Sequence, residues 1–204
     1  LILGGSGDTI LDGGEGVDTF KVDMSHYVLP QDDPNFTYLT NLSTGFAGSM
    51  NNPQHVNNDT LINIENIEYA GSISAHLYGD EGDNFILGGS GADRLYGGDG
   101  NDTLKPWEGD DTVFGEAGDD VLILKGSGNQ SFNGGADNDT LEIDHSDWTT
   151  MPAGFVGEAN LADGWAGEHL NPTAVGTDSV SLIENITLYG DVDYVVRGDT
   201  QDNI

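Results

Sequence analysis

A nine-residue period runs through much of the chain and restricts what it can fold into. Its template is G-G-x-G-x-D-x-U-x, where U is a large apolar residue. Five consecutive blocks follow it: GDEGDNFIL (79–87), GGSGADRLY (88–96), GGDGNDTLK (97–105), PWEGDDTVF (106–114) and GEAGDDVLI (115–123). After one extra residue, Leu124, two further blocks follow: KGSGNQSFN (125–133) and GGADNDTLE (134–142). Two more stand near the start of the chain: GGSGDTILD (4–12) and GGEGVDTFK (13–21).

Several blocks depart from this template. The blocks that start at Gly13, Gly88 and Gly97 match every position. The aspartate of position six is replaced in three blocks, by Thr9, Asn84 and Gln130. The two leading glycines are replaced in a fourth block, by Pro106 and Trp107. These replacements and the extra Leu124 are the places where we expect the regular structure to change.

The block predicts a turn followed by a short strand. Glycine at this density is too costly for a helix, and it permits the positive φ angles of tight turns. Positions seven to nine, such as residues 94–96, form a strand with one inward apolar side chain. A flexible linker would not keep an apolar residue at position eight, as this chain does at Leu95, Leu104, Val113, Leu122, Phe132 and Leu141. Two blocks then make one coil, and stacked coils place parallel strands about 4.8 Å apart. The predicted fold is all-β, a parallel β-roll or β-solenoid.

The same stacking predicts columns of carboxylates. Asp93 comes to lie near Asp111, eighteen residues later, and Asp102 likewise approaches Asp120. Such a column is strongly repulsive without a counter-ion. Carboxylate and carbonyl oxygens are hard ligands, which favour Ca²⁺ over Zn²⁺ or Cu²⁺.

The composition agrees with a need for cations. The chain has 36 acidic and 5 basic residues and a formal net charge of −31, so it repels itself when it compacts. With so few Lys and Arg residues, nucleic acid and anionic membranes are poor partners. The absence of Cys excludes disulfides and thiolate metal sites. No apolar run approaches the roughly 18 residues of a membrane helix, so no membrane insertion is expected.

These blocks resemble the RTX nonapeptide repeats of secreted bacterial proteins, which form a Ca²⁺-binding parallel β-roll. The resemblance implies Ca²⁺ between loops two blocks apart, held by position-six side chains and by main-chain carbonyls. The implied side-chain ligands are Asp18, Asn84, Asp93, Asp102, Asp111, Asp120 and Asp139. The implied carbonyl donors are Gly13, Glu15, Gly79, Glu81, Gly88, Ser90, Gly97, Asp99, Glu108, Gly115, Ala117, Gly134 and Ala136. It also implies export through a type I channel and a secreted, cell-surface location.

Two long interruptions lack the period but repeat each other 119 residues apart. NLSTGFAG (41–48) matches NLADGWAG (160–167), and DTLINIENI (59–67) matches DSVSLIENI (178–186). The three-residue spacing of Leu61, Ile64 and Ile67 also fits a helix, but the β-branched flanks favour strand–corner–strand. Residues 22–58 and 143–177 are expected to add wider coils and loops that lie against the solenoid.

The predicted organisation is therefore a short array (1–21), an interruption (22–78), the main array (79–142), a second interruption (143–197) and the start of another array (198–204). Joined to the head of the chain, the tail GDTQDNI (198–204) reads like residues 79–98 with one residue more. This favours the interpretation that the chain is one unit, or a part, of a long tandem-repeat protein. Its copies could stack end to end.

No pattern of catalytic residues stands out, so we expect no enzyme activity. There is no H-E-x-x-H or G-x-S-x-G motif, and the histidines are scattered: His26, His55, His76, His145 and His169. Trp107, Trp148 and Trp165 could stack on a glycan or seal the wider coils, and Trp107, in a glycine position, is expected to point outward.

The expected function is a structural repeat of a surface adhesin, fibre or layer that folds when it meets Ca²⁺ outside the cell. The alternative is a non-catalytic module of a secreted protease, lipase or polysaccharide-modifying enzyme. The head-to-tail match favours the first.

Overall fold

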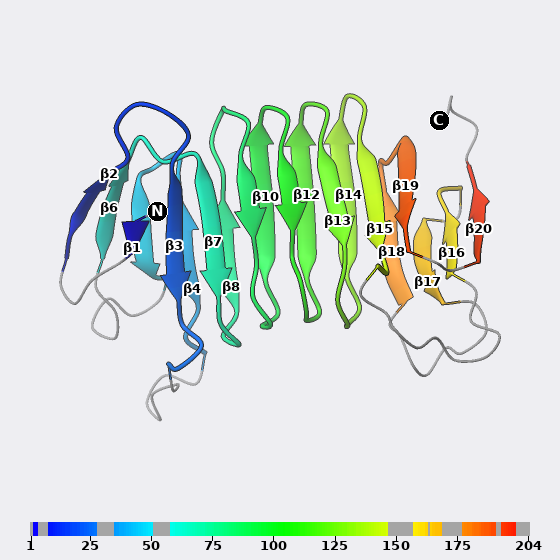
Figure 1. Cartoon of the computed structure of the whole chain (residues 1–204), viewed down its shortest axis with the longest axis horizontal. Helices are drawn as coiled ribbons and strands as arrows, with labels where there is room; N and C mark the ends of the chain where they lie inside the picture. Colours follow the sequence, from blue (N-terminus) through cyan, green and yellow to red (C-terminus); the bar gives the residue numbers. More distant parts are fainter. Residues whose placement is uncertain are drawn as a thin grey trace.

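Two β-sheets face each other along the length of the chain (Figure 1). The computed structural model describes residues 2–3, 8–27, 35–50, 58–146, 157–162, 164–168, 177–190 and 193–198. Sheet A has the strand order β1-β3-β7-β9-β11-β13-β15-β19, and sheet B has the order β2-β6-β5-β4-β8-β10-β12-β14-β18-β17-β16-β20. Within these described segments, no helix is long and apolar enough to cross a bilayer.

The strands of sheet A are β1 (Ile2–Leu3), β3 (Thr19–Asp23), β7 (Asn66–Ala70), β9 (Phe85–Leu87), β11 (Thr103–Lys105), β13 (Val121–Leu124), β15 (Thr140–Asp144) and β19 (Asn185–Tyr189). Those of sheet B are β2 (Ile10–Asp12), β4 (Tyr38–Asn41), β5 (Phe46–Ser49), β6 (Asp59–Ile62), β8 (Ala75–Tyr78), β10 (Arg94–Asp99), β12 (Thr112–Ala117), β14 (Ser131–Ala136), β16 (Gly157–Asn160), β17 (Trp165–Glu168), β18 (Thr177–Ser181) and β20 (Tyr194–Arg197).

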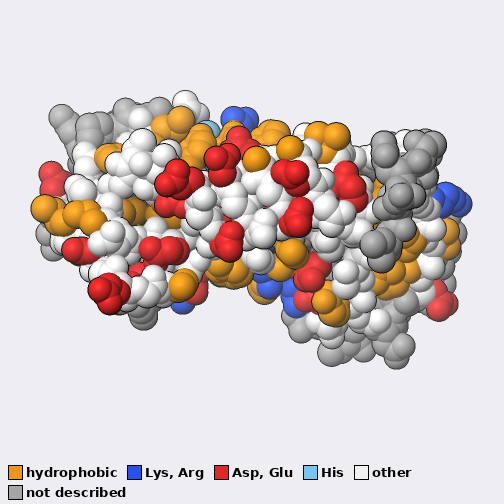
Figure 2. Space-filling model, turned by 90° about the horizontal axis from the view of Figure 1, so that it is seen from above, with side chains coloured by type: hydrophobic (Ala, Val, Ile, Leu, Met, Phe, Trp, Pro, Cys, Tyr) orange, Lys and Arg blue, Asp and Glu red, His pale blue; other side chains and the backbone are white. Residues whose placement is uncertain are grey.

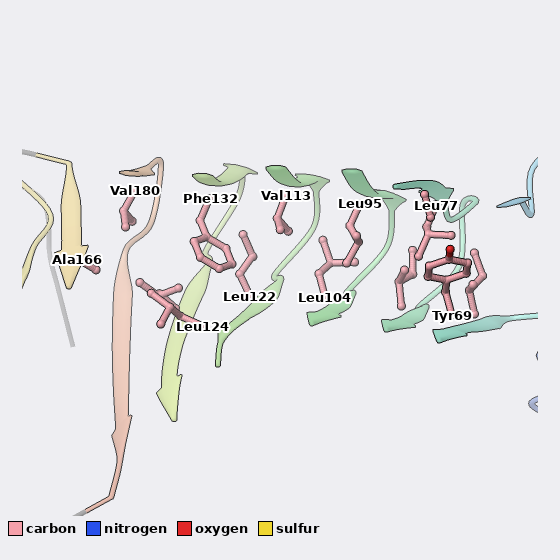
Figure 3. Packing of buried hydrophobic residues seen from close by; sticks show 14 of the residues in the cluster. Tyr69, Leu77, Leu95, Leu104, Val113, Leu122, Leu124, Phe132, Ala166 and Val180 are labelled. Atoms are coloured by element: carbon pink, nitrogen blue, oxygen red, sulfur yellow. The ribbon is translucent and has the colours of Figure 1, made fainter. Parts of the chain in front are cut away.

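The nine-residue blocks alternate between the two sheets, as the repeat predicts. Strand β10 pairs in parallel with β12, with Leu95 opposite Val113, and β11 pairs in parallel with β13. The apolar residues of position eight point from both sheets into one core (Figure 3). Each is at most 1% exposed: Leu95, Leu104, Val113, Leu122, Phe132 and Leu141. The chain is all-β and folds as a parallel β-roll.

The extra residue Leu124 is accommodated in a strand. It extends β13, where it is buried and lies opposite Ile143 of β15. The coil that contains it is nineteen residues long, since Thr112 pairs with Ser131. The insertion therefore adds an apolar side chain to the core.

The strand–corner–strand prediction for the interruptions is confirmed. Strand β6 in sheet B turns at Asn63, which has a φ of 51°, and continues as β7 in sheet A. The duplicate does the same from β18 to β19, with Leu182 at a φ of 51°. Asn adopts this left-handed conformation more readily than Leu does, so the identical corner at Leu182 is imposed by the flanking strands.

The wider coils take the form of antiparallel strands added to sheet B. Strand β4 lies beside β8 in parallel, β5 returns antiparallel to β4, and β6 runs antiparallel to β5. The second interruption repeats this order as β18-β17-β16-β20. Buried aromatic residues fill the wider interior of the first interruption, where the rings of Tyr38 and Tyr69 stack at 5.7 Å.

An aromatic row lies on the outer side of sheet B. The rings of Tyr78 and Tyr96 stack with centroids 4.5 Å apart, and those of Tyr96 and Phe114 with centroids 5.1 Å apart. The three residues are in register on β8, β10 and β12. Such cross-strand pairs reinforce the register that the glycine-rich turns require.

Candidate calcium-binding turns

Glycine-rich turns join the sheets along two edges of the roll. The A-to-B turns lead from sheet A to sheet B at residues 88–93, 106–111 and 125–130. The B-to-A turn segments comprise residues 79–84, 97–102, 115–120 and 134–139, and the first three residues of the last three segments still belong to β10, β12 and β14. Acidic side chains lie along the length of the roll when it is viewed from above (Figure 2).

Position-six aspartates form a hydrogen-bonded ladder along the B-to-A turns. The backbone N–H of Asn84 donates to Oδ1 of Asp102 at 2.7 Å. The N–H of Asp102 donates to Oδ1 of Asp120 at 2.8 Å, and that of Asp120 to Oδ1 of Asp139 at 2.9 Å. Successive carboxylates are therefore neighbours, as the period predicts.

The A-to-B turns carry a second ladder of the same kind. The N–H of Ala75 donates to Oδ1 of Asp93, and the N–H of Asp93 donates to Oδ1 of Asp111, both at 2.8 Å. The other oxygen of Asp93, Oδ2, accepts the N–H of Gly89 at 2.8 Å. Each ladder thus fixes one carboxylate oxygen of every aspartate.

The second carboxylate oxygen is left without a partner in most of these aspartates. The buried Oδ2 atoms of Asp102, Asp111, Asp120 and Asp139 have no hydrogen-bond partner among the described residues. These side chains are at most 2% exposed. Because a buried, unpaired charge is very costly, such an oxygen calls for a cation, so the turns fit a bound Ca²⁺.

Burial raises the pKa of all these carboxyls. The pKa reaches about 6 for Asp93, Asp102 and Asp120, about 7 for Asp139 and about 8 for Asp111. Desolvation is the largest cause in each case, and backbone N–H donors oppose it. Neighbouring carboxylates raise the pKa of Asp111, Asp120 and Asp139 further.

Where a block begins with glycine and has an aspartate at position six, that glycine makes room for the carboxylate of its own turn. A Cβ atom added to Gly97 would overlap Oδ2 of Asp102, and one added to Gly115 would overlap Oδ2 of Asp120. Carbonyl oxygens approach from the next coil as well, since the oxygen of Gly115 lies against Gly97. Glycine is needed here for space rather than for a positive φ.

We expect Gly97→Ala to weaken calcium binding and to destabilise the calcium-loaded roll by about 1–3 kcal/mol, the usual cost of overpacking. Its methyl group would displace the Asp102 carboxylate. Urea unfolding with calcium present measures the loss. Gly82→Ala is the matched control, because its Cβ would meet only Oδ1 of Asp80, at 3.4 Å. Equal stability of the two variants would show that the space beside Asp102 is not needed.

The implied carbonyl donors fall into two groups. Those at position one, such as Gly97, Gly115 and Gly134, point toward the preceding coil. At position three, the carbonyls of Ala117 and Ala136 accept the N–H groups of Gly100 and Gly118 at 2.9 and 3.2 Å. Exposed turn positions hold the remaining position-three residues: Glu15, Glu81, Ser90, Asp99 and Glu108.

The carboxylates are strung out along each edge rather than clustered. Within the described part of the chain, no three Asp, Glu or His side chains converge on one point. A cation at these turns must therefore combine carboxylates of successive coils with main-chain oxygens. Calcium accepts such a mixed oxygen set in flexible geometry.

The interruptions contribute buried carboxylates that the nine-residue period does not reveal. The N–H of Gln130 donates to Oδ1 of Asp178 at 2.7 Å, and the N–H of Thr9 donates to Oδ1 of Asp59 at 3.1 Å. Burial raises the pKa of Asp178 to about 7. The signal was present in the sequence, because D-T-L at 59–61 repeats the end of the block at 102–104.

Glutamates of the IEN segments extend the same ladders. The N–H of Asp18 donates to Oε2 of Glu65 at 2.7 Å, and the N–H of Asp139 donates to Oε2 of Glu184 at 2.9 Å. Asp18 is only partly buried, unlike the aspartates of the main array. Each interruption thus supplies a glutamate that continues the ladder of the last B-to-A turn before it.

The described tryptophan and histidine side chains make contacts of their own. Trp107 has a φ of 79° and is 38% exposed, which confirms that it points outward, and Nζ of Lys105 lies 4.7 Å from its ring centroid. Nδ1 of His145 is 2.7 Å from the hydroxyl of Tyr194. Trp148, His55, His169 and the side chain of Trp165 lie outside the described residues.

Comparison with known proteins agrees with this geometry. The family model for the RTX calcium-binding nonapeptide repeat, in four copies, matches residues 1–21, 69–104, 108–124 and 126–142. No curated protein matches the chain. The matched residues contain the position-six aspartates of all the nine-residue blocks. The aspartates that the interruptions add to the ladders, Asp59 and Asp178, lie outside the match. The family binds calcium, and the chain contains RTX calcium-binding nonapeptide repeats.

Proposed function

We propose that this chain is a structural repeat whose folding depends on calcium held in the turn ladders. The observation that carries the proposal is the set of buried Oδ2 atoms without a hydrogen-bond partner. The proposed side-chain ligands are Asp93, Asp102, Asp111, Asp120 and Asp139, joined by Asp18 at the start of the chain. Position-one carbonyls, which face the neighbouring coil, complete the ligand set.

The chain prepares these sites in three ways. Backbone N–H groups hold Oδ1 of each aspartate, so that Oδ2 has a fixed direction. Position-one glycines leave space beside Oδ2. The apolar core excludes water from the inner side of the turns. Bound Ca²⁺ supplies positive charge to this otherwise repulsive column, so its binding free energy becomes folding free energy.

The proposed setting is outside the cell, in a surface adhesin, fibre or layer. RTX repeats occur in secreted bacterial proteins. Extracellular calcium modules bind with dissociation constants of roughly 10⁻⁴ to 10⁻³ M, which suits folding after export. The duplication 119 residues apart, with the same strand order in both interruptions, supports an array of copies over a single accessory module.

Circular dichroism during a calcium titration tests the proposal. We expect a cooperative rise in β signal near millimolar Ca²⁺ at pH 8, reversed by chelator and absent with Mg²⁺. Magnesium demands a tighter octahedral site and sheds its water reluctantly, so it is a suitable control. A chain with the same β signal in chelator and in calcium would show that the apolar core alone holds the fold.

A further inference from the structure

Two of the buried position-six residues are amides rather than aspartates. Asn84 and Gln130 are each 3% exposed and occupy the same place in their turns as the aspartates of the ladders. A carboxylate at this place can only accept hydrogen bonds, whereas an amide also donates. At each of these two places the side chain can therefore donate a hydrogen bond, which an ionised aspartate cannot do.

Both amides donate to oxygens of the turns. Nδ2 of Asn84 donates to the carbonyl of Glu65 at 2.8 Å and to Oδ1 of Asp80 at 3.2 Å. Nε2 of Gln130 donates to the carbonyl of Trp107 at 2.9 Å. In both turns, therefore, a side-chain N–H group is the partner of these oxygens.

The remaining oxygen of Asn84 is also occupied. Its Oδ1 accepts the N–H of Asp80 at 2.8 Å, just as Oδ2 of Asp93 accepts the N–H of Gly89. The Asn84 side chain is therefore bonded at both ends without an ion. As a neutral amide, this side chain also has no negative charge that a cation would have to offset.

The neighbouring turn of the preceding coil, at residues 106–111, also departs from the template. Pro106 replaces the glycine that makes room for a carboxylate elsewhere, and the carbonyl of Trp107 lies in a backbone with a φ of 79°. The coil between these two turns is nineteen residues long. The turn that faces the amide is thus altered together with it.

We propose that Asn84 and Gln130 close their places in the ladders without calcium, so that ions bind only where two carboxylates are neighbours. We call the space between two successive position-six residues a rung. In the main array the rungs with two aspartates are Asp93–Asp111, Asp102–Asp120 and Asp120–Asp139. The inference rests on the proposed calcium function and adds which rungs are loaded.

The competing role is that an amide oxygen is itself a calcium ligand. Oε1 of Gln130 is buried and has no hydrogen-bond partner in the described structure. Of the two amides, Gln130 is therefore the better candidate for a calcium ligand. In that case the rungs beside Gln130 already hold calcium. The number of bound ions separates the two roles, because a carboxylate would then change the affinity and not the count.

The test uses isosteric variants and counts calcium per chain by equilibrium dialysis with elemental analysis. Under our proposal, Asn84→Asp gains one ion and Gln130→Glu gains at least one. Both should also unfold more easily in chelator, because an N–H donor is replaced by a buried charge. Asp83→Asn is the control: its side chain is exposed and accepts the N–H of Asn101, so its count should equal that of the parent chain. An unchanged count in both variants, with tighter binding, would overturn the proposal.

The converse substitutions give a second test that does not need a new site to form. Asp111 belongs to one rung with two aspartates and Asp120 to two, so Asp111→Asn should lose one ion and Asp120→Asn two. Equal losses of two ions would show that the rung shared by Asp111 and Gln130 is loaded, and would reject the inference. A parent chain that binds no calcium would instead refute the proposed function itself.

Discussion

Lowering the pH from 8 to 5 should restore the β-roll in chain that has been stripped of calcium. Burial raises the pKa of five ladder aspartates to between about 6 and about 8: Asp93, Asp102, Asp111, Asp120 and Asp139. Their pKa in the unfolded chain is close to 3.9. Since the folded value is the higher one, the stability of the metal-free roll is greatest below about pH 4, falls as the pH rises from there to the folded pKa values of about 6 to 8, and is constant above them.

Each rise of two pKa units corresponds to about 3 kcal/mol of stability lost by the metal-free roll at high pH. Circular dichroism against pH in stripped chain measures the change. The expected midpoint lies between pH 6 and 8, above the range near 4 where exposed carboxylates titrate. With saturating calcium, the same scan should stay flat from pH 8 to pH 6. Stripped chain that is equally folded at pH 5 and pH 8 would contradict the burial of these charges.

Asp120→Asn should have opposite effects with and without calcium. In calcium the variant should be destabilised, because Asp120 lies between Asp102 and Asp139 and contributes to both rungs. A tenfold weaker affinity at each rung corresponds to about 1.4 kcal/mol. In chelator at pH 8 the variant should be more stable than the parent chain, since a buried carboxylate with a raised pKa is replaced by a neutral group.

Urea unfolding of Asp120→Asn in calcium and in chelator gives both signs in one experiment. Asp119→Asn is the matched control, because Asp119 is the exposed neighbour and its Oδ1 accepts the N–H of Asn138 at 3.0 Å. Asparagine keeps that acceptor, so we expect little change under either condition. A loss of stability in both conditions would mean that the Asp120 carboxylate has a structural role independent of calcium.

The parts of the fold that could be predicted are those that depend on local sequence. Glycine positions determine the turns, and the alternation around Leu95 or Leu104 determines which side chain enters the core. The eighteen-residue coil then places Asp102 beside Asp120 without further information. The β-branched flanks around Ile64 likewise predicted strand–corner–strand rather than a helix, and the corner lies at Asn63.

The antiparallel strands of the interruptions could not be predicted in this way. Strands β4 and β5 lack the period, and β4 pairs with β8, which follows it by more than thirty residues. Such a pairing depends on space left by the rest of the fold. For the same reason, Asp59 and Asp178 were missed as members of the ladders, since each reaches its place only through β6 or β18.

Each interruption adds two strands to sheet B, β5 and β4 in the first and β17 and β16 in the second. Between β6 and β8, sheet B contains two additional strands, β5 and β4, whereas β7 and β9 are direct neighbours in sheet A. At about 4.8 Å per strand, sheet B becomes roughly 10 Å longer at each interruption. A filament whose two sides differ in arc length cannot remain straight unless the sheets separate. In a longer array, the spacing of the interruptions would set the curvature of the fibre, and the number of nine-residue blocks between them the distance from one bend to the next.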